Sequence, residues 1–400
     1  MNEIVQPRVK LVAIAKDEAA YLPEWIFHHK RMGFDLIEVY VNRTTDNSQD
    51  MLKYLSSKFS GISCKSADWI DYCPAGAQHN LQYIIYSKAY ADTLEADDAD
   101  YVLFLDIDEF WTPKSMATQV QSVIAKYPKA DAISFQWIND YGSDAPFQPL
   151  RQDILGKINP LVKTLVKVGA PITKIGYHMP ELDNGSKHIL MDGDTVKRDE
   201  RVEEGIAKEL QHMRPVMIIH RLFRSPKEYV SLLHRGRPSD EMQLKLNRGG
   251  YNYVMGREVS YPLNEDNYAQ YRQALDGFLQ SAELKSLLSI AREFVEARYQ
   301  KALDAVANIK AKNFHDLARI FRGCTEDERK LVFDTIASSR FLREQESVQT
   351  VIDIAKKVDE SDLHMGYIIW KRARELRPQG PLIQKRIARY EKLVADGELT

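Results

Sequence analysis

Short apolar runs alternate with amphipathic and polar segments over the first third of the chain. Apolar runs bounded by polar turns are typical of strands buried on both faces of a sheet, and apolar positions three or four apart are typical of packed helices. Strands and helices that alternate in this way predict a parallel sheet with right-handed crossovers, and hence an α/β fold. The predicted strands are 9–15, 36–42, 61–67, 101–105 and 130–138, and the predicted helices include 20–33 and 78–96.

The pattern changes twice further along the chain. From residue 139 to about 265, glycines and prolines interrupt it, and 215–223 is the clearest strand. Beyond residue 267, alanine, leucine and charged residues interleave at helical spacing. Two prolines break this pattern at a turn like that of a tetratricopeptide pair, although no clear repeat of about 34 residues is present. We therefore expect an α/β domain over residues 1–265 and an all-helical region over 266–400.

Composition narrows the class of protein. The 400 residues are 44% hydrophobic and 28% charged, with a net charge of −2, which argues against bulk binding to nucleic acid or to an anionic membrane. Three cysteines without a CxxC spacing predict neither a disulfide framework nor a zinc site. No apolar run reaches the roughly 18 residues of a membrane span, and the first residues lack a signal-peptide pattern. We expect a cytoplasmic protein that is a candidate for peripheral association with the inner face of the membrane.

The run YVLFLDIDEFW at 101–111 carries the clearest chemical signal. Asp106 and Asp108 follow a buried strand at a spacing of two, so both are expected on one face at its carboxyl end, where open α/β sheets bind ligands. Two neighbouring carboxylates repel each other unless a cation lies between them, and a divalent metal is the usual answer. The pattern predicts a metal-dependent enzyme that acts on a phosphorylated ligand.

Further motifs occur in a fixed order around this run. They are Lys16-Asp17-Glu18, then Tyr21-Leu22, Glu24-Trp25-Ile26 and His29, then Asn42 and Asp46, the element Asp106–Phe110, His220 with Arg224-Ser225, and Arg235-Gly236. Over about residues 8–240 the chain thereby resembles nucleotide-sugar glycosyltransferases of the GT-A fold. More narrowly, it resembles the family-2-like and family-92 group with a DxDEF element. The resemblance implies a GT-A-like domain followed by a helical appendage.

The resemblance also implies how the metal is held. Asp108 is the first choice as a direct ligand of Mn²⁺ or Mg²⁺, and Asp106 lies nearer the ribose and the water shell of the metal. His220 is the third ligand in this family reading, and His178 competes for the same role. The metal would neutralise the charge that develops on the leaving diphosphate.

The nucleotide is expected to bind to loops that follow the strands. Lys16, Asp17 and Glu18 would hold the base and ribose, because an acid there can accept from their N–H and hydroxyl groups. Arginines suit phosphate oxygens because their donors are planar and bidentate. The other expected nucleotide-binding residues are Asn42, Asp46, Gln78 with Gln82, Asp106, Arg224 and Arg235.

An inverting transfer, which only the resemblance implies, needs a general base near the acceptor hydroxyl. Asp140 and Asp144 follow the strand at 130–138, and Glu181 and Asp183 are rivals that the sequence does not separate. Trp111, Trp137 and Tyr141 are candidates to stack on sugar rings.

The expected reaction moves a sugar from a nucleoside diphosphate, with UDP as the expected nucleotide, to a hydroxyl of a glycan or lipid-linked acceptor in surface polysaccharide synthesis. One alternative is a phosphohydrolase of the haloacid dehalogenase type, although Phe110 stands where those enzymes carry threonine or valine. Another is a non-catalytic protein that binds protein partners through its helical region.

Overall fold

The computed structural model describes residues 6–234, 244–254, 256–309, 313–337, 347–359, 362–396 and 398–399. Contacts between residues divide the chain into two compact units. The first unit takes in residues 1–142, 147–224 and 255–294, and the second takes in 143–146, 225–254 and 295–400. The predicted division into domains 1–265 and 266–400 stays a prediction.

The first unit is built on a ten-stranded sheet with the strand order β3-β2-β1-β4-β7-β6-β11-β5. The first four strands in this order run parallel to one another, as strands joined by helical crossovers do. The run VKLVAIA of the central strand β1 is almost entirely buried, because both of its faces are covered. These strands are β1 (Val9–Ala15), β2 (Leu36–Val41), β3 (Ile62–Ser66) and β4 (Tyr101–Phe104).

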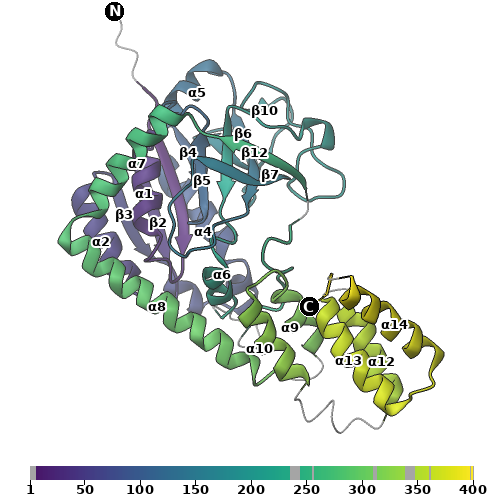
Figure 1. Cartoon of the computed structure of the whole chain (residues 1–400). Coiled ribbons are helices and arrows are strands. Elements are labelled where there is room, and N and C mark those ends of the chain that lie inside the picture. The colour runs from purple at the N-terminus through teal and green to yellow at the C-terminus, as the bar shows by residue number, and fades with distance from the viewer. Residues whose placement is uncertain are drawn as a thin grey trace, which may run out of the picture. The chain divides into compact units, whose positions relative to one another are not determined.

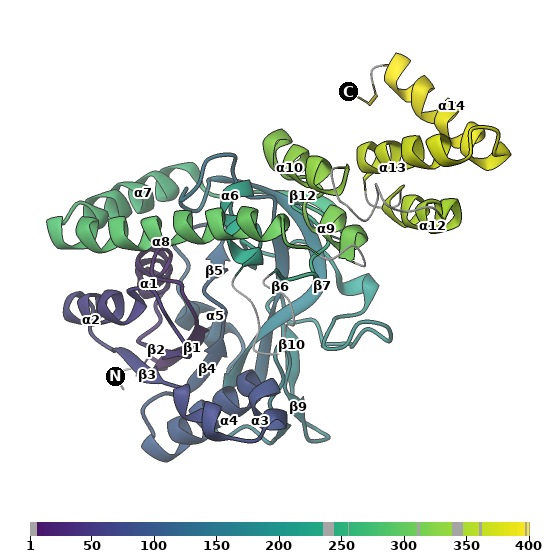
Figure 2. The same cartoon turned by 90° about the horizontal axis from the view of Figure 1, so that it is seen from below.

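Helices cover both faces of this parallel half, as Figures 1 and 2 show. They are α1 (Leu22–Arg31), α2 (Ser48–Lys58), α4 (Leu81–Ala96), α7 (Glu265–Leu279) and the first part of α8 (Ala282–Val306). The core on the side of α1, α2 and α7 includes Leu11 and Val39, whereas Val12 packs on the side of α4. Successive strand residues point to opposite faces, so alternate positions of β1 serve the two cores.

The second half of the sheet is mixed. The longest described strand, β7 (Asp153–Lys167), pairs antiparallel with β4 and with β6 (Ala132–Asp140). β6 is parallel to β11 (Val216–His220), and β5 (Glu109–Pro113) pairs antiparallel with β11. The register of β6 and β7 shifts between Gln136 and Ile138, opposite a segment that contains Pro160. Proline donates no hydrogen bond, so it is expected at such an irregularity in the ladder.

Shorter elements fill the connections of the first unit. The 3₁₀ helix η1 (Asp68–Tyr72) and α3 (Ala75–His79) precede α4, and Asn80 separates α3 from α4. β10 pairs with β6, β12 pairs with β7, and β8 and β9 form a separate two-stranded sheet. The remaining elements are α5 (Val120–Lys126), β8 (Ile172–Lys174), β9 (Glu181–Leu182), β10 (His188–Leu190), η2 (Lys208–Leu210) and β12 (Arg257–Pro262).

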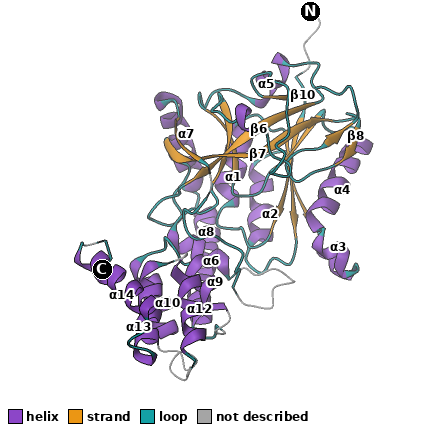
Figure 3. Cartoon of the chain, turned by 90° about the vertical axis from the view of Figure 1, so that its right-hand side faces the viewer, coloured by secondary structure: helices purple, strands orange, loops and turns teal. Residues whose placement is uncertain are grey.

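The regular elements of the second unit are helices in the part of the chain that is described (Figure 3). Trp370 is fully buried, and its Nε1 donates to the carboxylate of Asp359 at 3.0 Å, which also accepts from the Tyr390 hydroxyl. These contacts join the last three helices, whose relation to a tetratricopeptide pair stays a prediction. The helices are α6 (Pro226–Leu233), the last part of α8, α9 (Phe314–Ile320), α10 (Glu326–Ala337), α12 (Val348–Asp359), α13 (Leu363–Leu376) and α14 (Pro381–Ala395).

The predicted α/β class with a helical C-terminal region is confirmed. The sheet is parallel in its first half, but β5 and β7 make the second half mixed. The helix expected over 78–96 is interrupted at Asn80, and β7 has no counterpart among the predicted strands. None of the described helices has a stretch long and apolar enough to cross a membrane.

Candidate active site

Asp108 and His220 lie close together at the start of β5 and the end of β11. Asp108 lies in the turn between β4 and β5, and His220 is the last residue of β11, where it pairs with Glu109 of β5. The Asp108 Oδ2 atom lies 3.6 Å from His220 Nε2. The backbone N–H of Arg221 donates to the Asp108 carbonyl at 2.7 Å, which fixes the turn against the end of β11.

The imidazole of His220 is held on its other side by β6. Its Nδ1 atom lies 3.1 Å from Asn139 Oδ1, and its ring centroid lies 4.2 Å from that of Trp137. Burial alone would lower the pKa of His220, but the carboxylate of Asp108, with those of Glu109 and Asp106, raises it above the ordinary value. The side chain therefore has a fixed orientation with Nε2 toward Asp108.

Asp106 lies among donors supplied by the protein itself. Its Oδ1 atom is 3.4 Å from Gln82 Nε2 and 3.5 Å from the Tyr86 hydroxyl, both on α4. Its Oδ2 atom is 3.8 Å from Nζ of Lys163, a residue of β7. The positive charge that was expected beside Asp106 is therefore provided in part by the ammonium group of Lys163.

Glu109 and Lys163 form a buried ion pair behind the turn. The Lys163 Nζ atom lies 3.2 Å from Glu109 Oε2, and both side chains are at most 1% exposed. Burial raises the pKa of Glu109 to about 7, although Lys163 opposes this shift. Burial would lower the pKa of Lys163, but Asp106 and Glu109 raise it above the ordinary value. Burial thus disfavours both charges, and the attraction between them offsets this cost.

The side chains of Asp108 and His220 suit a hard divalent cation. A carboxylate oxygen and an imidazole nitrogen are accepted ligands of Mn²⁺, and carboxylates also suit Mg²⁺. Ligand atoms lie about 2.1 Å from such an ion, so two of its ligands are at most about 4.2 Å apart, which the Asp108–His220 pair satisfies. Asp106 does not join Asp108 and His220 in a group of three metal-ligating side chains. Among the described residues, the group whose ligand atoms all lie within 4.8 Å of one another is at another place in the fold.

That other set is Asp192, Asp194 and His212, near the opposite end of β11. Nε of Arg214 lies 2.6 Å from Asp192 Oδ2, so a protein cation already binds this carboxylate. The set is exposed. It therefore carries no argument for a metal.

The loops after β1 and β2 are joined by the acids that were expected to hold the nucleotide. Asp17 Oδ1 accepts from the backbone N–H of Thr45 at 2.7 Å, and Asp46 Oδ2 accepts from that of Ala19 at 2.9 Å. Asp17 has a φ of 55°, a left-handed conformation that is uncommon outside glycine, asparagine and aspartate. These carboxylates shape the loops, and their predicted contact with a nucleotide stays a prediction.

Glu18 and Arg224 form a second buried ion pair. The Arg224 Nη2 atom lies 3.1 Å from Glu18 Oε2, and the side chains are 4% and 8% exposed, respectively. The guanidinium also lies over the ring of Tyr21, 3.4 Å from its centroid. Lys16, next to this pair in sequence, is half-buried. The structure thus brings together two residues that were expected at the two ends of one nucleotide.

Asn42 and Gln78 lie nearer the edge strand β3. Asn42 Nδ2 donates to the carbonyl of Ala67 at 3.2 Å. Gln78 Nε2 donates to the carbonyl of Cys73 at 3.0 Å and so closes the turn before α3. Arg235, the remaining expected phosphate ligand, lies outside the described residues.

The expected general bases have different surroundings. Asp140 is buried at the end of β6, and its Oδ1 atom lies 2.6 Å from Nη2 of Arg151. Glu181 on β9 is exposed and pairs with Lys174, and Asp183 is exposed one residue beyond that strand. Asp144 is exposed and belongs to residues 143–146 of the second unit.

A loop beside the site is held by one carboxylate. Glu204 accepts hydrogen bonds from the backbone N–H groups of Tyr177, His178 and Met179. His178 packs edge-on to Trp137, and burial lowers its pKa to about 2. The competing metal ligand His178 is therefore neutral, and both His178 and His220 pack against Trp137.

Replacing Glu204 by alanine is expected to speed hydrogen exchange at residues 177–179 by about tenfold or more. Each buried backbone donor that loses its acceptor costs about 1–3 kcal/mol, which favours local opening. Hydrogen exchange measured by mass spectrometry checks this. The neighbouring exposed Glu203 provides the control, since Glu203→Ala should leave exchange unchanged; equal effects of both substitutions would contradict the assignment.

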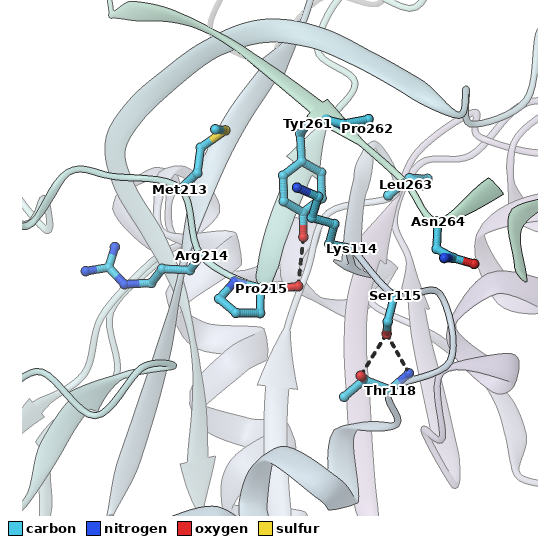
Figure 4. A pocket seen from close by; sticks show the side chains of 10 residues that line it. All are labelled: Lys114, Ser115, Thr118, Met213, Arg214, Pro215, Tyr261, Pro262, Leu263 and Asn264. Atoms are coloured by element: carbon cyan, nitrogen blue, oxygen red, sulfur yellow. Dashed lines mark hydrogen bonds between the residues drawn. The ribbon is translucent and has the colours of Figure 1, made fainter.

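A pocket of about 760 Å³ lies elsewhere in the first unit (Figure 4). It is lined by Lys114, Ser115, Tyr261 and Leu263, among others, and the Tyr261 hydroxyl donates to the carbonyl of Pro215. These residues adjoin the ends of β5 and β11 that are opposite Glu109 and His220. The pocket contains no expected site residue and carries no functional argument.

Comparisons with known proteins agree with the family resemblance that the sequence motifs indicated. A family model for glycosyltransferase family 92 matches residues 12–167. A glycosyltransferase family 92 protein of Arabidopsis thaliana is 25% identical over 124 residues, which are 29% of this chain and 20% of that protein. The chain thus matches about a fifth of that relative's length.

A solved structure also aligns with the chain. It is the mannosyltransferase PcManGT from Pyrobaculum calidifontis in complex with GDP-Man and Mn²⁺, at 10% identity, covering 94% of this chain and 89% of the other, with a TM-score of 0.27. A score this low adds nothing to the argument. The two family matches confirm that the chain resembles the glycosyltransferases of family 92.

Proposed function

We propose, from the resemblance to glycosyltransferase family 92, that this protein is a metal-dependent glycosyltransferase. The observation that carries the proposal is that the family match contains Asp108, whose carboxylate lies 3.6 Å from His220. We propose that the donor is a nucleoside-diphosphate sugar, with UDP as the first nucleotide to test, and that the acceptor is a hydroxyl of a glycan or lipid-linked sugar.

The residues of this chain would divide the work. Asp108 and His220 would hold Mn²⁺ or Mg²⁺, which when bound would neutralise charge on the leaving diphosphate. The loops after β1 and β2 would hold the base and ribose, in the conformation that Asp17 and Asp46 fix. Asp106 would face the ribose from its position between α4 and Lys163.

The general base stays open among Asp140, Asp144, Glu181 and Asp183, and inversion at the anomeric carbon is a proposal that depends on it. Arg151 holds one oxygen of Asp140, so only the other could accept a proton from a hydroxyl. Binding of protein partners by the helical unit, peripheral membrane association and a cytoplasmic role in polysaccharide synthesis are likewise proposals.

The test is calorimetric titration of UDP into the protein with Mn²⁺ and with EDTA, followed by hydrolysis assays with UDP-sugars. Binding that requires Mn²⁺ and slow hydrolysis of one donor support the proposal. Binding of GDP instead would change the donor alone. Absence of binding to any nucleoside diphosphate, or phosphate release from simple esters, would contradict it.

A further inference from the structure

Lys163 lies between the two carboxylates that flank Asp108 in the turn. Its Nζ atom is 3.2 Å from Glu109 Oε2 and 3.8 Å from Asp106 Oδ2, and it also donates to the carbonyl of Tyr177 at 3.3 Å. The side chain is 1% exposed. A buried ammonium is stabilised only where its charge is neutralised, so these acids hold it as much as it holds them.

Donors of the chain other than Lys163 also contact these two acids. Asp106 Oδ1 lies 3.4 Å from Gln82 Nε2 and 3.5 Å from the Tyr86 hydroxyl. Glu109 Oε2 accepts the backbone N–H of Asp106 at 2.9 Å, within the turn itself. Both carboxylates are therefore oriented by donors of the chain before any ion binds.

Asp108 differs from both neighbours. It points to His220, whose Nε2 lies 3.6 Å from its Oδ2, a separation that two ligands of one ion can have. Its side chain is 23% exposed, between that of Asp106 at 41% and that of Glu109, which is fully buried, so Asp108 can be reached from solution.

We propose that Lys163 is a positioning residue that withholds Asp106 and Glu109 from a bound cation and leaves Asp108 and His220 as its protein ligands. This inference rests on the metal-dependent site of the proposed function. Lys163 substitutes for the second positive charge that adjacent carboxylates otherwise require, and a nucleotide can then approach Asp106 without displacing a metal ligand.

The inference predicts a dependence between Asp106 and Lys163 that a cycle of variants can measure. Mn²⁺ affinity is determined by calorimetry and by the spectrum of free Mn²⁺ in electron paramagnetic resonance, without nucleotide. Asp106→Asn is expected to weaken binding less than about 3-fold, below the roughly 10–100-fold typical of groups that orient ligands, whereas Asp108→Asn should weaken it by more than that range.

The Asp106→Asn substitution is then made in a protein that lacks the buried pair of Lys163 and Glu109. Lys163→Met with Glu109→Gln keeps the side-chain volumes and leaves no buried charge unpaired. Asp106 is then free to reach the ion, so Asp106→Asn in this background is expected to weaken Mn²⁺ binding by about 10-fold or more. Equal effects of Asp106→Asn in both backgrounds, whether large or small, would overturn the inference.

Two further results keep the outcome clear. Thermal unfolding shows whether the double variant folds. If it does not, Asp106→Asn in the native background still tests the inference, because a loss of Mn²⁺ affinity as large as that of Asp108→Asn overturns it. Wild-type protein that binds no Mn²⁺ overturns the inference. A cycle with the expected pattern in a protein that hydrolyses no nucleotide sugar leaves the inference standing and overturns the proposed transferase.

Discussion

Replacing Asp108 by asparagine is expected to abolish Mn²⁺-dependent UDP binding and to reduce sugar transfer at least about 1,000-fold. A metal that neutralises a leaving diphosphate supplies several kcal/mol in the transition state, and each 1.36 kcal/mol is about a tenfold change in rate. Asp108 has the geometry of a direct ligand, since its carboxylate lies 3.6 Å from His220 Nε2. Calorimetry and a transfer assay with the identified donor measure the two effects.

The control for this substitution is Asp50→Asn, which removes an exposed acid in the first turn of α2. It should leave binding and transfer within about twofold, because an exposed surface charge contributes little. Far-ultraviolet circular dichroism should show both variants folded. Asp108→Asn protein that retains metal-dependent transfer would contradict the assignment of this turn as the metal site.

The second large effect is expected at the buried pair of Glu18 and Arg224. Arg224→Met should lower the free energy of unfolding of the α/β unit by about 3–5 kcal/mol, since it leaves a buried carboxylate without its cation. Urea unfolding measures this change. The substitution also removes the contact between the guanidinium and the ring of Tyr21, which lowers the free energy of unfolding further.

A compensating variant separates the charge from the contact. Glu18→Gln together with Arg224→Met removes both charges, and a buried pair replaced by neutral groups of similar size is often close to neutral in stability. The double variant should therefore be more stable than Arg224→Met alone. If it is as unstable as the single variant, the ion pair is not what holds the loop after β1.

The N-terminal half of the fold could be predicted because its signals are local. The strands β1, β2 and β4 are mainly apolar runs, and a parallel strand buried on both faces leaves that pattern in the sequence. The edge strand β3 is short and more polar. The break at Asn80 could not be seen, since the residues around it fit a continuous helix and only packing separates α3 from α4.

The strand β7 was missed because its sequence looks like a loop. Gly156 and Pro160 interrupt it, and only pairing with β6 on one side and β12 on the other shows how they are accommodated. A Cβ at Gly156 would lie 2.1 Å from the Asn139 carbonyl oxygen, so the glycine permits a close approach of backbones. Such a requirement comes from a strand distant in sequence.

The candidate site shows the same division. Asp108 lies beside His220, which could be expected because motif order and strand ends are readable from one sequence, whereas Asp106 contacts α4 and Lys163. Lys163 and Glu204 carry no motif, and a lysine in a half-polar segment predicts only a solvated side chain. The carboxylate partners of Lys163 are 54 or more residues away, and the backbone donors to Glu204 are 25 or more residues away, so only the folded sheet identifies them.

The place of β7 between β4 and β6 also constrains the order in which the chain can fold. The parallel strands β1 to β4 are complete once residue 104 has been synthesised, but one edge of β4 has no partner until Lys167 has followed. An apolar strand with an open edge is a template for pairing with another chain. Pairings between residues distant in sequence also form slowly. A ribosome-bound chain that ends before β7 is therefore the stage at which this protein is most prone to aggregation, and translation from β4 to β7 sets how long that stage lasts.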